Sequence, residues 1–274
     1  MKNNKTDIVV MIPARIGSKG IPRKVIRPFN GKPLLFYTID LALNIPNAVI
    51  YINTDSNLIF DLISKEYKSK VKIFLRDKKY GDDDVTLDEL VLNFIAENNF
   101  KEDHILTIQP TSPLIRLETI LNFVNEYKKS NYNSLITVKE NRKLEWEKNK
   151  KGVYKPIYKK RLNRQLLKPK YTETGALVIS KIKLILSSGT RFNSNTGIFS
   201  LNFRESIDID TYEDWLIAET LFKSKKIIFY TSANKKLGSG HLKRCLSLAF
   251  SFPSYDIQFI LHKTDNTWIE KIKL

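Results

Sequence analysis

Cysteine and histidine are scarce in this sequence. Its 274 residues include one cysteine, Cys245, and three scattered histidines. A single thiol rules out an internal disulfide framework, and this set cannot supply the ligands of a Cys/His zinc site. One free cysteine fits a reducing compartment, so we expect a cytoplasmic protein.

Long apolar runs are absent as well. No hydrophobic stretch approaches the roughly 20 residues that a membrane-spanning helix needs. The first residues, MKNNKTD, are polar and lack the apolar core of a signal peptide. We therefore expect no membrane partner. The chain does have 42% hydrophobic and 11% aromatic residues, enough for one large α/β domain or for a domain and part of another.

Acidic residues are in deficit. The chain has 29 Asp and Glu against 46 Lys and Arg, which gives a formal net charge of +17. Such a charge raises the hypothesis of nucleic-acid binding. The cations are dispersed, however, and no helix-turn-helix, RNA-recognition or zinc-finger pattern accompanies them. We expect no nucleic-acid partner. The positive electrostatic field of these cations would also favour small polyanionic ligands.

The most informative stretch is IPARIGSKGIPRK, residues 12–24. It follows an apolar run, residues 8–12, that predicts a buried parallel strand. Open α/β sheets bind ligands in loops at the carboxyl ends of their strands. Glycines let backbone amides approach an anion, and the four cations of this loop suit phosphate oxygens. We expect a polyphosphate cradle. A basic, solvated surface loop is the alternative, because neither the Walker pattern nor G-x-G-x-x-G is present.

Strand and helix patterns alternate after this loop. Strands are predicted at residues 48–52, 71–75, 104–108, 134–138 and 176–179. Helices are predicted at residues 34–43, before the first of these strands, and at 87–98. This alternation indicates a mainly parallel sheet with right-handed crossovers. Residues 139–170 are less regular, strongly basic and dotted with aromatic residues. They could form a lid, an arm exchanged with a second subunit, or a solvated excursion.

Two polar segments follow predicted strands. RDKKYGDDDVT, residues 76–86, contains three consecutive aspartates, for which we favour helix capping over metal binding. QPTSPLIR, residues 109–116, makes a rigid turn on the ligand side of the sheet. Ser112 could also cap a helix that starts at Pro113.

The segment SIDIDTYED, residues 206–214, carries a candidate metal pair. Asp208 and Asp210 are one residue apart, so both carboxylates project from the same side of an extended chain. Oxygen ligands of this kind suit Mg²⁺ together with phosphates and water. Thr211 can cap the next helix. The alternative is a capping cluster with a second acid left on the surface.

Three of these segments resemble the hallmarks of the acylneuraminate cytidylyltransferase (CMP-sialic acid synthetase) family. IPARxGSKG with PRK, QPTSPL and SIDIDT occur in the family's order within residues 7–222. The resemblance implies an α/β, Rossmann-like nucleotide-diphospho-sugar transferase fold. Its mainly parallel mixed sheet would have flanking helices and a protruding dimerisation arm. Residues 1–222 would form the cytidylyltransferase domain.

The activity that the resemblance implies is transfer of CMP from CTP to a nonulosonic acid, an acidic nine-carbon sugar. Pyrophosphate would be released, Mg²⁺ would be the cofactor, and the enzyme would be a homodimer serving surface glycan biosynthesis. One alternative is CMP activation of another acidic sugar, such as ketodeoxyoctonate. Another is a non-catalytic nucleotide-binding paralogue.

The resemblance also assigns individual residues. Catalytic roles fall to Arg15, Lys24 and Arg164, and Asp208 and Asp210 would hold the metal. Gln109 and Arg164 would contact the sugar acid, Arg164 from the exchanged arm. The residues implied in nucleotide binding are Ala14, Arg15, Ser18, Lys19, Lys24, Arg76 and Thr86.

The chain departs from the family pattern in four places. Val25 replaces an asparagine that reads cytosine, so base selection must come from backbone groups or another side chain, or be weaker. Asp84 stands where a hydroxyl residue is usual. Thr174 and Val178 replace an asparagine and a tyrosine of the sugar pocket, which leaves the exact acid open.

Residues 223–274 carry a different resemblance. A predicted strand, residues 227–230, leads to GSGHLKRCLSLA, which is similar to the opening GxGHxxRCLxLA motif of the UDP-sugar hydrolase of pseudaminic acid biosynthesis. His241 would be the base of that enzyme. About fifty residues cannot form a two-domain hydrolase. We expect a truncated or split second domain without hydrolase activity, or a helical appendage docked on the first domain. This pairing favours pseudaminic or legionaminic acid as substrate.

Overall fold

The computed structural model describes residues 8–252 and 255–272, which form parts of two compact units, Met1–Ala218 and Glu219–Leu274. The division falls inside helix α6 (Tyr212–Lys223). The domain boundary expected after residue 222 lies near the end of the same helix.

Strands and helices alternate along much of the first unit, as the apolar pattern predicts. Its first part contains β1 (Ile8–Ala14), β2 (Pro28–Phe29), β3 (Lys32–Pro33), α1 (Leu34–Ala42), β4 (Ala48–Thr54), α2 (Asn57–Tyr67), β5 (Lys72–Leu75), α3 (Leu87–Ala96), β6 (His104–Ile108) and α4 (Leu117–Lys129). Its second part contains β7 (Ser134–Asn141), β8 (Trp146–Lys148), β9 (Tyr154–Pro156), β10 (Lys170–Lys181), α5 (Ile182–Ser188), β11 (Thr196–Ser200) and α6. Short 3-10 helices occur at Lys24–Ile26, Lys68–Lys70, Lys78–Gly81 and Arg164–Leu166.

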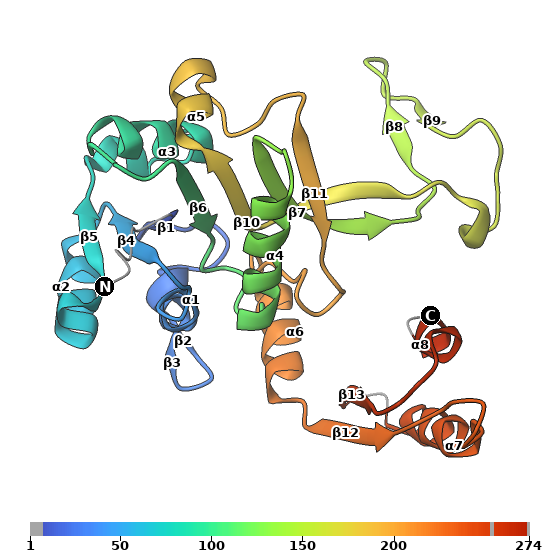
Figure 1. Cartoon of the computed structure of the whole chain (residues 1–274). Coiled ribbons are helices and arrows are strands. Elements are labelled where there is room, and N and C mark those ends of the chain that lie inside the picture. Colours follow the sequence, from blue (N-terminus) through green and yellow to red (C-terminus); the bar gives the residue numbers. More distant parts are fainter. Residues whose placement is uncertain (1–7, 253–254, 273–274) are drawn as a thin grey trace. The chain divides into compact units, whose positions relative to one another are not determined.

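A seven-stranded sheet in the order β11-β7-β10-β6-β1-β4-β5 forms the centre of the first unit (Figure 1). The pairs β1–β4, β1–β6, β4–β5 and β7–β11 are parallel, whereas β10 is antiparallel to both of its neighbours. The expected mainly parallel, mixed sheet is therefore confirmed. Its parallel strands place their carboxyl ends, and the loops that follow them, on one edge.

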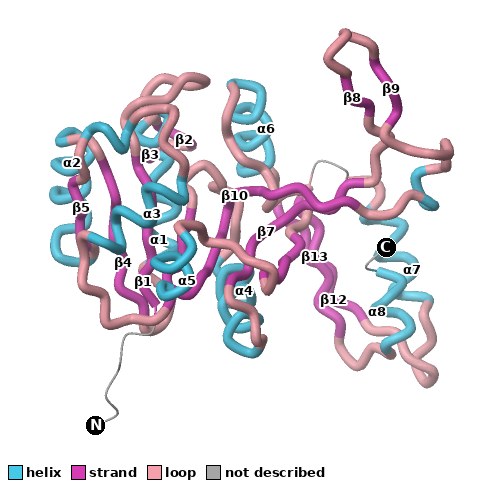
Figure 2. The backbone as a smooth tube through the Cα atoms, turned by 90° about the horizontal axis from the view of Figure 1, so that it is seen from above, coloured by secondary structure: helices cyan, strands magenta, loops and turns pink. Residues whose placement is uncertain are grey.

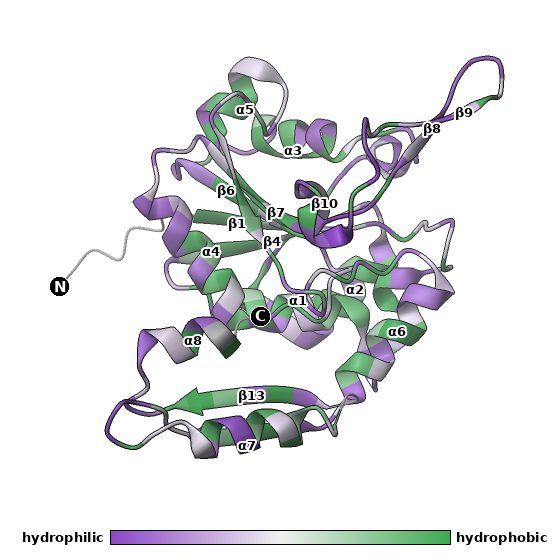
Figure 3. Ribbon diagram, turned by 90° about the vertical axis from the view of Figure 1, so that its right-hand side faces the viewer, coloured by the Kyte–Doolittle hydropathy of each residue, from purple (hydrophilic) through white to green (hydrophobic). Residues whose placement is uncertain are grey.

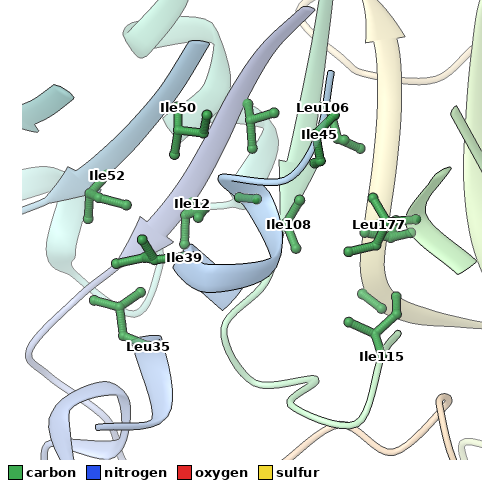
Figure 4. Packing of buried hydrophobic residues seen from close by; sticks show 14 of the residues in the cluster. Ile12, Leu35, Ile39, Ile45, Ile50, Ile52, Leu106, Ile108, Ile115 and Leu177 are labelled. Carbon is green, nitrogen blue, oxygen red and sulfur yellow. The ribbon is translucent and has the colours of Figure 1, made fainter. Parts of the chain in front are cut away.

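Helices cover both faces of this sheet, because the strands are apolar on both sides. Residues of α1, α2 and α4 pack with Val10 and Ile12 of β1 on one face. Residues of α3 and α5 pack with Val9 and Met11 on the other face. Figure 4 shows the first of these clusters from close by. Each fully buried aliphatic side chain stabilises the fold by roughly 1.5–3 kcal/mol, and the loops at the ligand edge rest on this core.

Helix α4 begins later than the sequence suggests. It starts at Leu117 after Arg116, and Ser112 does not cap it. The amide of its N-cap residue, Arg116, is held by Glu205, whose Oε1 accepts from this amide at 3.0 Å and from Thr119 Oγ1 at 2.6 Å. Residues 109–115 form turns instead, in which the Ser112 amide donates to the carbonyl of Gln109 at 3.4 Å and the Ile115 amide donates to the carbonyl of Ser112 at 3.3 Å. Glu205 lies 89 positions from Arg116 in the sequence, so the local sequence cannot indicate this contact.

β7 and β10 continue beyond the sheet and form an arm (Figure 1). The register between them shifts between Glu173 and Val178, where Gly175 has a φ of 71°. Beyond this irregularity, residues 170–173 pair with 138–141, and the hairpin β8–β9 lies in the segment between the two strands. Figure 2 shows the hairpin projecting away from the sheet. β10 is longer than the predicted strand because its outer half belongs to this arm.

The second unit has the order β12 (Lys226–Thr231), α7 (Gly240–Ala249), β13 (Asp256–Leu261) and α8 (Asn266–Ile272). β12 and β13 are parallel, so β12, α7 and β13 form a βαβ unit. Figure 3 shows β13 mostly in the hydrophobic colours and α7 with mixed faces. Among the described residues of both units, no helix is long and apolar enough to cross a membrane.

Candidate active site

A cleft of about 270 Å³ lies at the carboxyl edge of the central sheet. It brings together the loop after β1, the segment between β5 and α3, the turn after β6 and the segment before α6. These are the stretches that the sequence singled out for chemistry. The cleft is lined by Pro13, Arg15, Gly17, Ser18, Lys24, Val25, Arg76, Tyr80, Asp82, Asp83, Val85, Thr86, Leu87, Leu90, Gln109, Pro110, Thr111 and Asp210.

Lys24 ties the first loop to the metal-pair segment. Its side chain is buried, and its Nζ donates to the carbonyl of Ile209 at 2.6 Å and to Asp210 Oδ1 at 2.9 Å. Gly20 permits the same approach, because a Cβ at this position would lie 2.0 Å from the carbonyl oxygen of Asp210. The loop and the segment therefore meet in backbone contact, with a buried ammonium group between them.

The turn after β6 holds the metal-pair segment from its other side. The amide of Ile209 donates to the carbonyl of Thr111 at 2.8 Å, and the side chain of Ile209 is fully buried. These contacts hold the segment in place at Ile209, which stands between Asp208 and Asp210 in the sequence. The three hallmark segments thus form one structural unit.

The two carboxylates differ in their surroundings. Asp208 is partly buried and its Oδ1 has no hydrogen-bond partner among the described residues. Burial raises the pKa of Asp208, and the nearby charge of Asp210 also raises it, while Thr111 and Lys24 act in the opposite direction. Asp210 is exposed. A buried oxygen without a partner next to a second carboxylate is a donor set that fits Mg²⁺.

No group of three or more His, Cys, Asp or Glu side chains that could hold a metal occurs among the described residues. The protein would therefore supply two carboxylates to a metal at this place. Phosphate oxygens and water would have to supply the remaining ligands, as they do in many magnesium sites that act on nucleotides.

Gln109 lies beside Asp208 at the end of β6. A Cβ on Gly175 would lie 2.9 Å from Gln109 Nε2 and 3.9 Å from Asp208 Oδ2. The irregularity in β10 thus brings a glycine against the amide that is expected to contact the sugar acid. Thr174 and Val178, which replace residues of the family's sugar pocket, are both buried, and Thr174 Oγ1 donates to Thr137.

Arg76 is buried under the first loop. Its Nη1 donates to the carbonyl of Asn53 at 2.6 Å and to Asn53 Oδ1 at 2.9 Å, and its Nη2 pairs with Asp55 Oδ1 at 3.3 Å. Asp55 Oδ1 also accepts from the amide of Ile16 at 3.3 Å. Burial lowers the pKa of Arg76, and the charge of Asp55 opposes that shift. Arg76 lines the cleft as expected, and it also fixes the shape of the loop through Asp55.

The three consecutive aspartates do not cap helix α3, contrary to expectation. The cap is Thr86, which forms a capping box with Glu89: the Glu89 amide donates to Thr86 Oγ1 at 3.2 Å and Thr86 donates back. Asp83 instead forms ion pairs with Arg15 Nη1 at 2.8 Å and with Lys19 Nζ at 2.9 Å. The aspartates precede the cap by two or more positions, too far for their side chains to reach the first free amides of the helix.

Of the remaining residues predicted to bind the nucleotide, some line the cleft and others do not. Ser18 lines the cleft, whereas Lys19 borders it through Asp83, which does line it. Ala14 is fully buried at the end of β1 and belongs to the core. Val25 lines the cleft and also packs into the core, so its isopropyl group presents an apolar patch to the ligand space.

Two predicted residues lie elsewhere. Arg164 is exposed in a short 3-10 helix within the arm and is not among the residues that line the cleft. His241 is exposed at the start of α7 in the second unit, 3.4 Å from Arg244 through its Nδ1. Within the first unit, the structure does not bring Arg164 into the cleft.

Several lining residues escaped the sequence analysis. Tyr80 lies in the 3-10 helix Lys78–Gly81 and Val85 in the loop after it, and nothing in their local pattern marks a ligand wall. Asp55 does not line the cleft but supports Arg76, which does, while the neighbouring Ser56 caps α2. The excess of acids beside a basic loop was the one available signal for Asp83, because opposite charges at facing loops attract.

The fold is similar to two solved structures. One is CMP:2-keto-3-deoxy-manno-octonic acid synthetase complexed with CTP, at 13% identity and a TM-score of 0.56, covering 79% of this chain and 98% of that one. The other is the 4-diphosphocytidyl-2C-methyl-D-erythritol synthase of Anaerococcus prevotii, at 16% identity and a TM-score of 0.58, covering 81% and 97%. The fold is thus that of the Rossmann-like nucleotidyltransferases.

The sequence model of the cytidylyltransferase family matches residues 9–215, and the chain belongs to this family. It is 32% identical over 226 residues to the CMP-N,N'-diacetyllegionaminic acid synthase of Legionella pneumophila, covering 79% of this chain and 96% of that protein. It is 31% identical over 227 residues to the pseudaminic acid cytidylyltransferase of Campylobacter jejuni, covering 78% and 95%. The family expected from the hallmark segments is confirmed.

N-acylneuraminate cytidylyltransferases of Streptococcus agalactiae also match. One is 26% identical over 216 residues, which is 76% of this chain but 51% of the streptococcal protein. The chain therefore spans about half the length of these relatives.

Proposed function

We propose that this protein transfers CMP from CTP to a nonulosonic acid and releases pyrophosphate. The relatives named for legionaminic, pseudaminic and N-acylneuraminic acids support this class of acceptor. A cytoplasmic location and a role in surface glycan biosynthesis belong to the same proposal.

The observation that carries the proposal is the meeting of three hallmark segments at one cleft. The buried Lys24 contacts both Ile209 and Asp210, and the amide of Ile209 contacts Thr111. The cleft is lined by cations suited to a triphosphate, by Asp210 of the proposed metal pair and by the amide of Gln109, and Asp208 lies beside Gln109. Nucleotidyl transfer requires such a combination, because positioning and charge neutralisation dominate its catalysis.

The chain's own residues would act as follows. Arg15, Lys19 and Lys24 neutralise the triphosphate, whose developing charge is greatest as pyrophosphate leaves. Gln109 orients the acid, so that its anomeric hydroxyl oxygen attacks the α-phosphorus of CTP while the bond to pyrophosphate breaks. Asp208 and Asp210 would hold Mg²⁺, which when bound neutralises phosphate charge and lowers the pKa of the attacking hydroxyl.

We further propose a homodimer in which the arm supplies Arg164 to the partner's cleft. Arg164 is exposed on the arm of its own chain, and a guanidinium group suits the carboxylate of a nonulosonic acid. Trp146 and Tyr154 are each more than half exposed near the arm's tip. Aromatic side chains of this kind are enriched at protein interfaces.

The experiment that tests the function measures pyrophosphate release with CTP, Mg²⁺ and a panel of acids. The panel should contain N-acetylneuraminic, legionaminic, pseudaminic and ketodeoxyoctonic acids. We expect turnover with at least one of the nine-carbon acids. Turnover with ketodeoxyoctonate alone would reassign the acceptor, and binding of CTP without turnover of any acid would indicate a non-catalytic paralogue.

A metal-pair variant makes the test specific. Asp210→Ala should lower turnover by roughly a thousandfold or more, because a metal ligand and the partner of Lys24 are lost together. Asp210 is exposed, so the fold should persist. The matched control is Glu213→Ala, which removes an exposed carboxylate three positions along the chain and outside the cleft. Near-normal turnover of Asp210→Ala would contradict the metal assignment.

A further inference from the structure

Asp83 joins the two outer cations of the first loop. Its Oδ1 lies 2.8 Å from Arg15 Nη1, and its Oδ2 lies 2.9 Å from Lys19 Nζ. Arg15 Nη1 also donates to the carbonyl of Gly81 at 3.4 Å. Each carboxylate oxygen thus accepts from a different cation, which is how two oxygens of a phosphate chain would be bound at the same place.

This pairing uses the donors that the proposed function requires for the triphosphate. A guanidinium or ammonium group that points at Asp83 cannot point at a phosphate oxygen with the same N–H at the same time. Hydrogen bonds from Lys19 and then Arg15 hold the pKa of Asp83 below its usual range, so it is ionised at neutral pH. The carboxylate and the triphosphate are therefore competitors for one set of charges.

The segment that carries Asp83 is fixed at its ends and loosely held between them. Gly81 packs so closely on Asp55 that a Cβ would lie 2.6 Å from Asp55 Oδ2, and Thr86 is held by the capping box of α3. Between them, the backbone bonds are long: 3.5 Å from the Asp82 amide to Lys79 O and 3.3 Å from the Val85 amide to Asp82 O. Few contacts oppose a local movement of residues 82–85.

We propose that Asp83 is an internal competitor of the triphosphate: it binds Arg15 and Lys19, is displaced by the nucleotide, and returns as pyrophosphate leaves. This inference rests on the proposed function. The observed affinity for phosphate ligands is then a difference between two sets of contacts. Asp83 weakens nucleotide binding and accelerates the release of pyrophosphate.

The test compares Asp83→Asn with Asp84→Asn in the full chain. Both substitutions remove one negative charge, but Asp84 is exposed, lies outside the cleft and has no ion pair within the described residues. Calorimetry with inorganic pyrophosphate is the direct probe, and inhibition of turnover by pyrophosphate is the kinetic one. For Asp83→Asn we expect the dissociation constant and the inhibition constant of pyrophosphate to fall by about three- to tenfold. A change of this size corresponds to the loss of two exposed ion pairs.

The Michaelis constant for CTP should fall with them, while kcat should stay equal or decrease because product leaves more slowly. Asp84→Asn should stay within about twofold of the wild type. If Asp83→Asn binds pyrophosphate no more tightly than Asp84→Asn, the inference is wrong. Weaker binding would also overturn it, since Asp83 would then assist the ligand.

A second measurement needs no variant. Amide exchange at residues 83–85 of the wild type should become faster when pyrophosphate binds, because Asp83 is released, while exchange at residues 15–20 should become slower. Protection of both segments would mean that Asp83 remains in place and would refute the inference. If neither the wild type nor either variant binds pyrophosphate or CTP, the proposed function itself fails, whereas equal binding by all three leaves that function intact and removes only the role of Asp83.

Discussion

Val25 is the residue at which this cleft departs most clearly from the pattern of its family. It lines the cleft with an apolar side chain and is anchored in the main core of the sheet. An isopropyl group offers neither a donor nor an acceptor to a pyrimidine base. The amino group that distinguishes cytosine from uracil therefore gains nothing from this position.

We expect weak discrimination between CTP and UTP. A site that hydrogen-bonds the distinguishing group rejects the wrong ligand by about 10⁴-fold or more, whereas an apolar wall achieves only about 10²-fold. The ratio of kcat/KM for CTP and UTP, measured by pyrophosphate release, should be near the lower value. Val25→Asn should raise the ratio, and Val25→Ala, which only shortens the side chain, should not. A ratio above about 10⁴ in the wild type would assign base reading to a backbone group or another lining side chain.

At the same scale, the predictable residues are those whose role is local. Asp208 and Asp210 are paired as metal ligands from the sequence because alternate residues of an extended chain share a side, and this pairing stays a prediction. Lys24 could be placed in the cleft, but its contact with Ile209 spans 185 positions. The partner of Asp83 could not be inferred either, since its ion pairs depend on how two loops meet.

Among the elements, α3 contributes most directly to the wall of the cleft. Thr86, Leu87 and Leu90 line it, and the capping box of Thr86 and Glu89 fixes where the helix begins. Hydrogen bonds from the Thr86 amide and hydroxyl hold the pKa of Glu89 below its usual value. The ionised carboxylate therefore stabilises this helix start.

The pH dependence of stability should reveal this capping box. Because the pKa of Glu89 is lower in the folded than in the unfolded state, its contribution is present above the unfolded pKa and is lost as the pH falls through the folded value. Thermal unfolding followed between about pH 6 and pH 3 should show the wild type losing stability more steeply than Glu89→Gln, because glutamine does not titrate. Parallel curves for the two proteins would contradict the predicted role.

Element positions were predicted well where the apolar pattern was strong and poorly where distant contacts decide. The strand at residues 104–108 begins and ends where predicted. Helix α4 does not begin at the QPTSP turn, because Glu205 from another part of the chain caps it at Arg116. The outer half of β10 was missed because it is exposed and pairs only with β7 in the arm.

At the scale of the whole molecule, the arm separates Arg164 from the cleft of its own chain. Arg164 is exposed among residues that the arm carries beyond the sheet. If a partner's arm completes each cleft, a site is built from the body of one chain and the arm of the other. Mixing two inactive variants then tests the proposed homodimer.

We expect a mixture of Arg164→Ala and Asp210→Ala to recover turnover. In a random mixture about half of the dimers are heterodimers, and one of their two sites combines an intact body with an intact arm, so roughly a quarter of wild-type turnover should return. Light scattering on each variant gives the control for dimer formation. If Arg164 serves its own chain, no heterodimer contains a complete site and the mixture stays inactive.

The sequence by itself determined the alternation of strands and helices, the three hallmark segments and hence the family. These properties depend on short-range periodicity and on the chemistry of single segments, and both are determined by residues that are close together in the sequence. Only the tertiary structure decided that Asp83 pairs with Arg15 and Lys19, that Glu205 caps α4, and that Arg164 lies outside its own cleft. Those outcomes depend on which loops the sheet brings to one edge, and the free energy of such contacts is set by distance in space, not by distance along the chain.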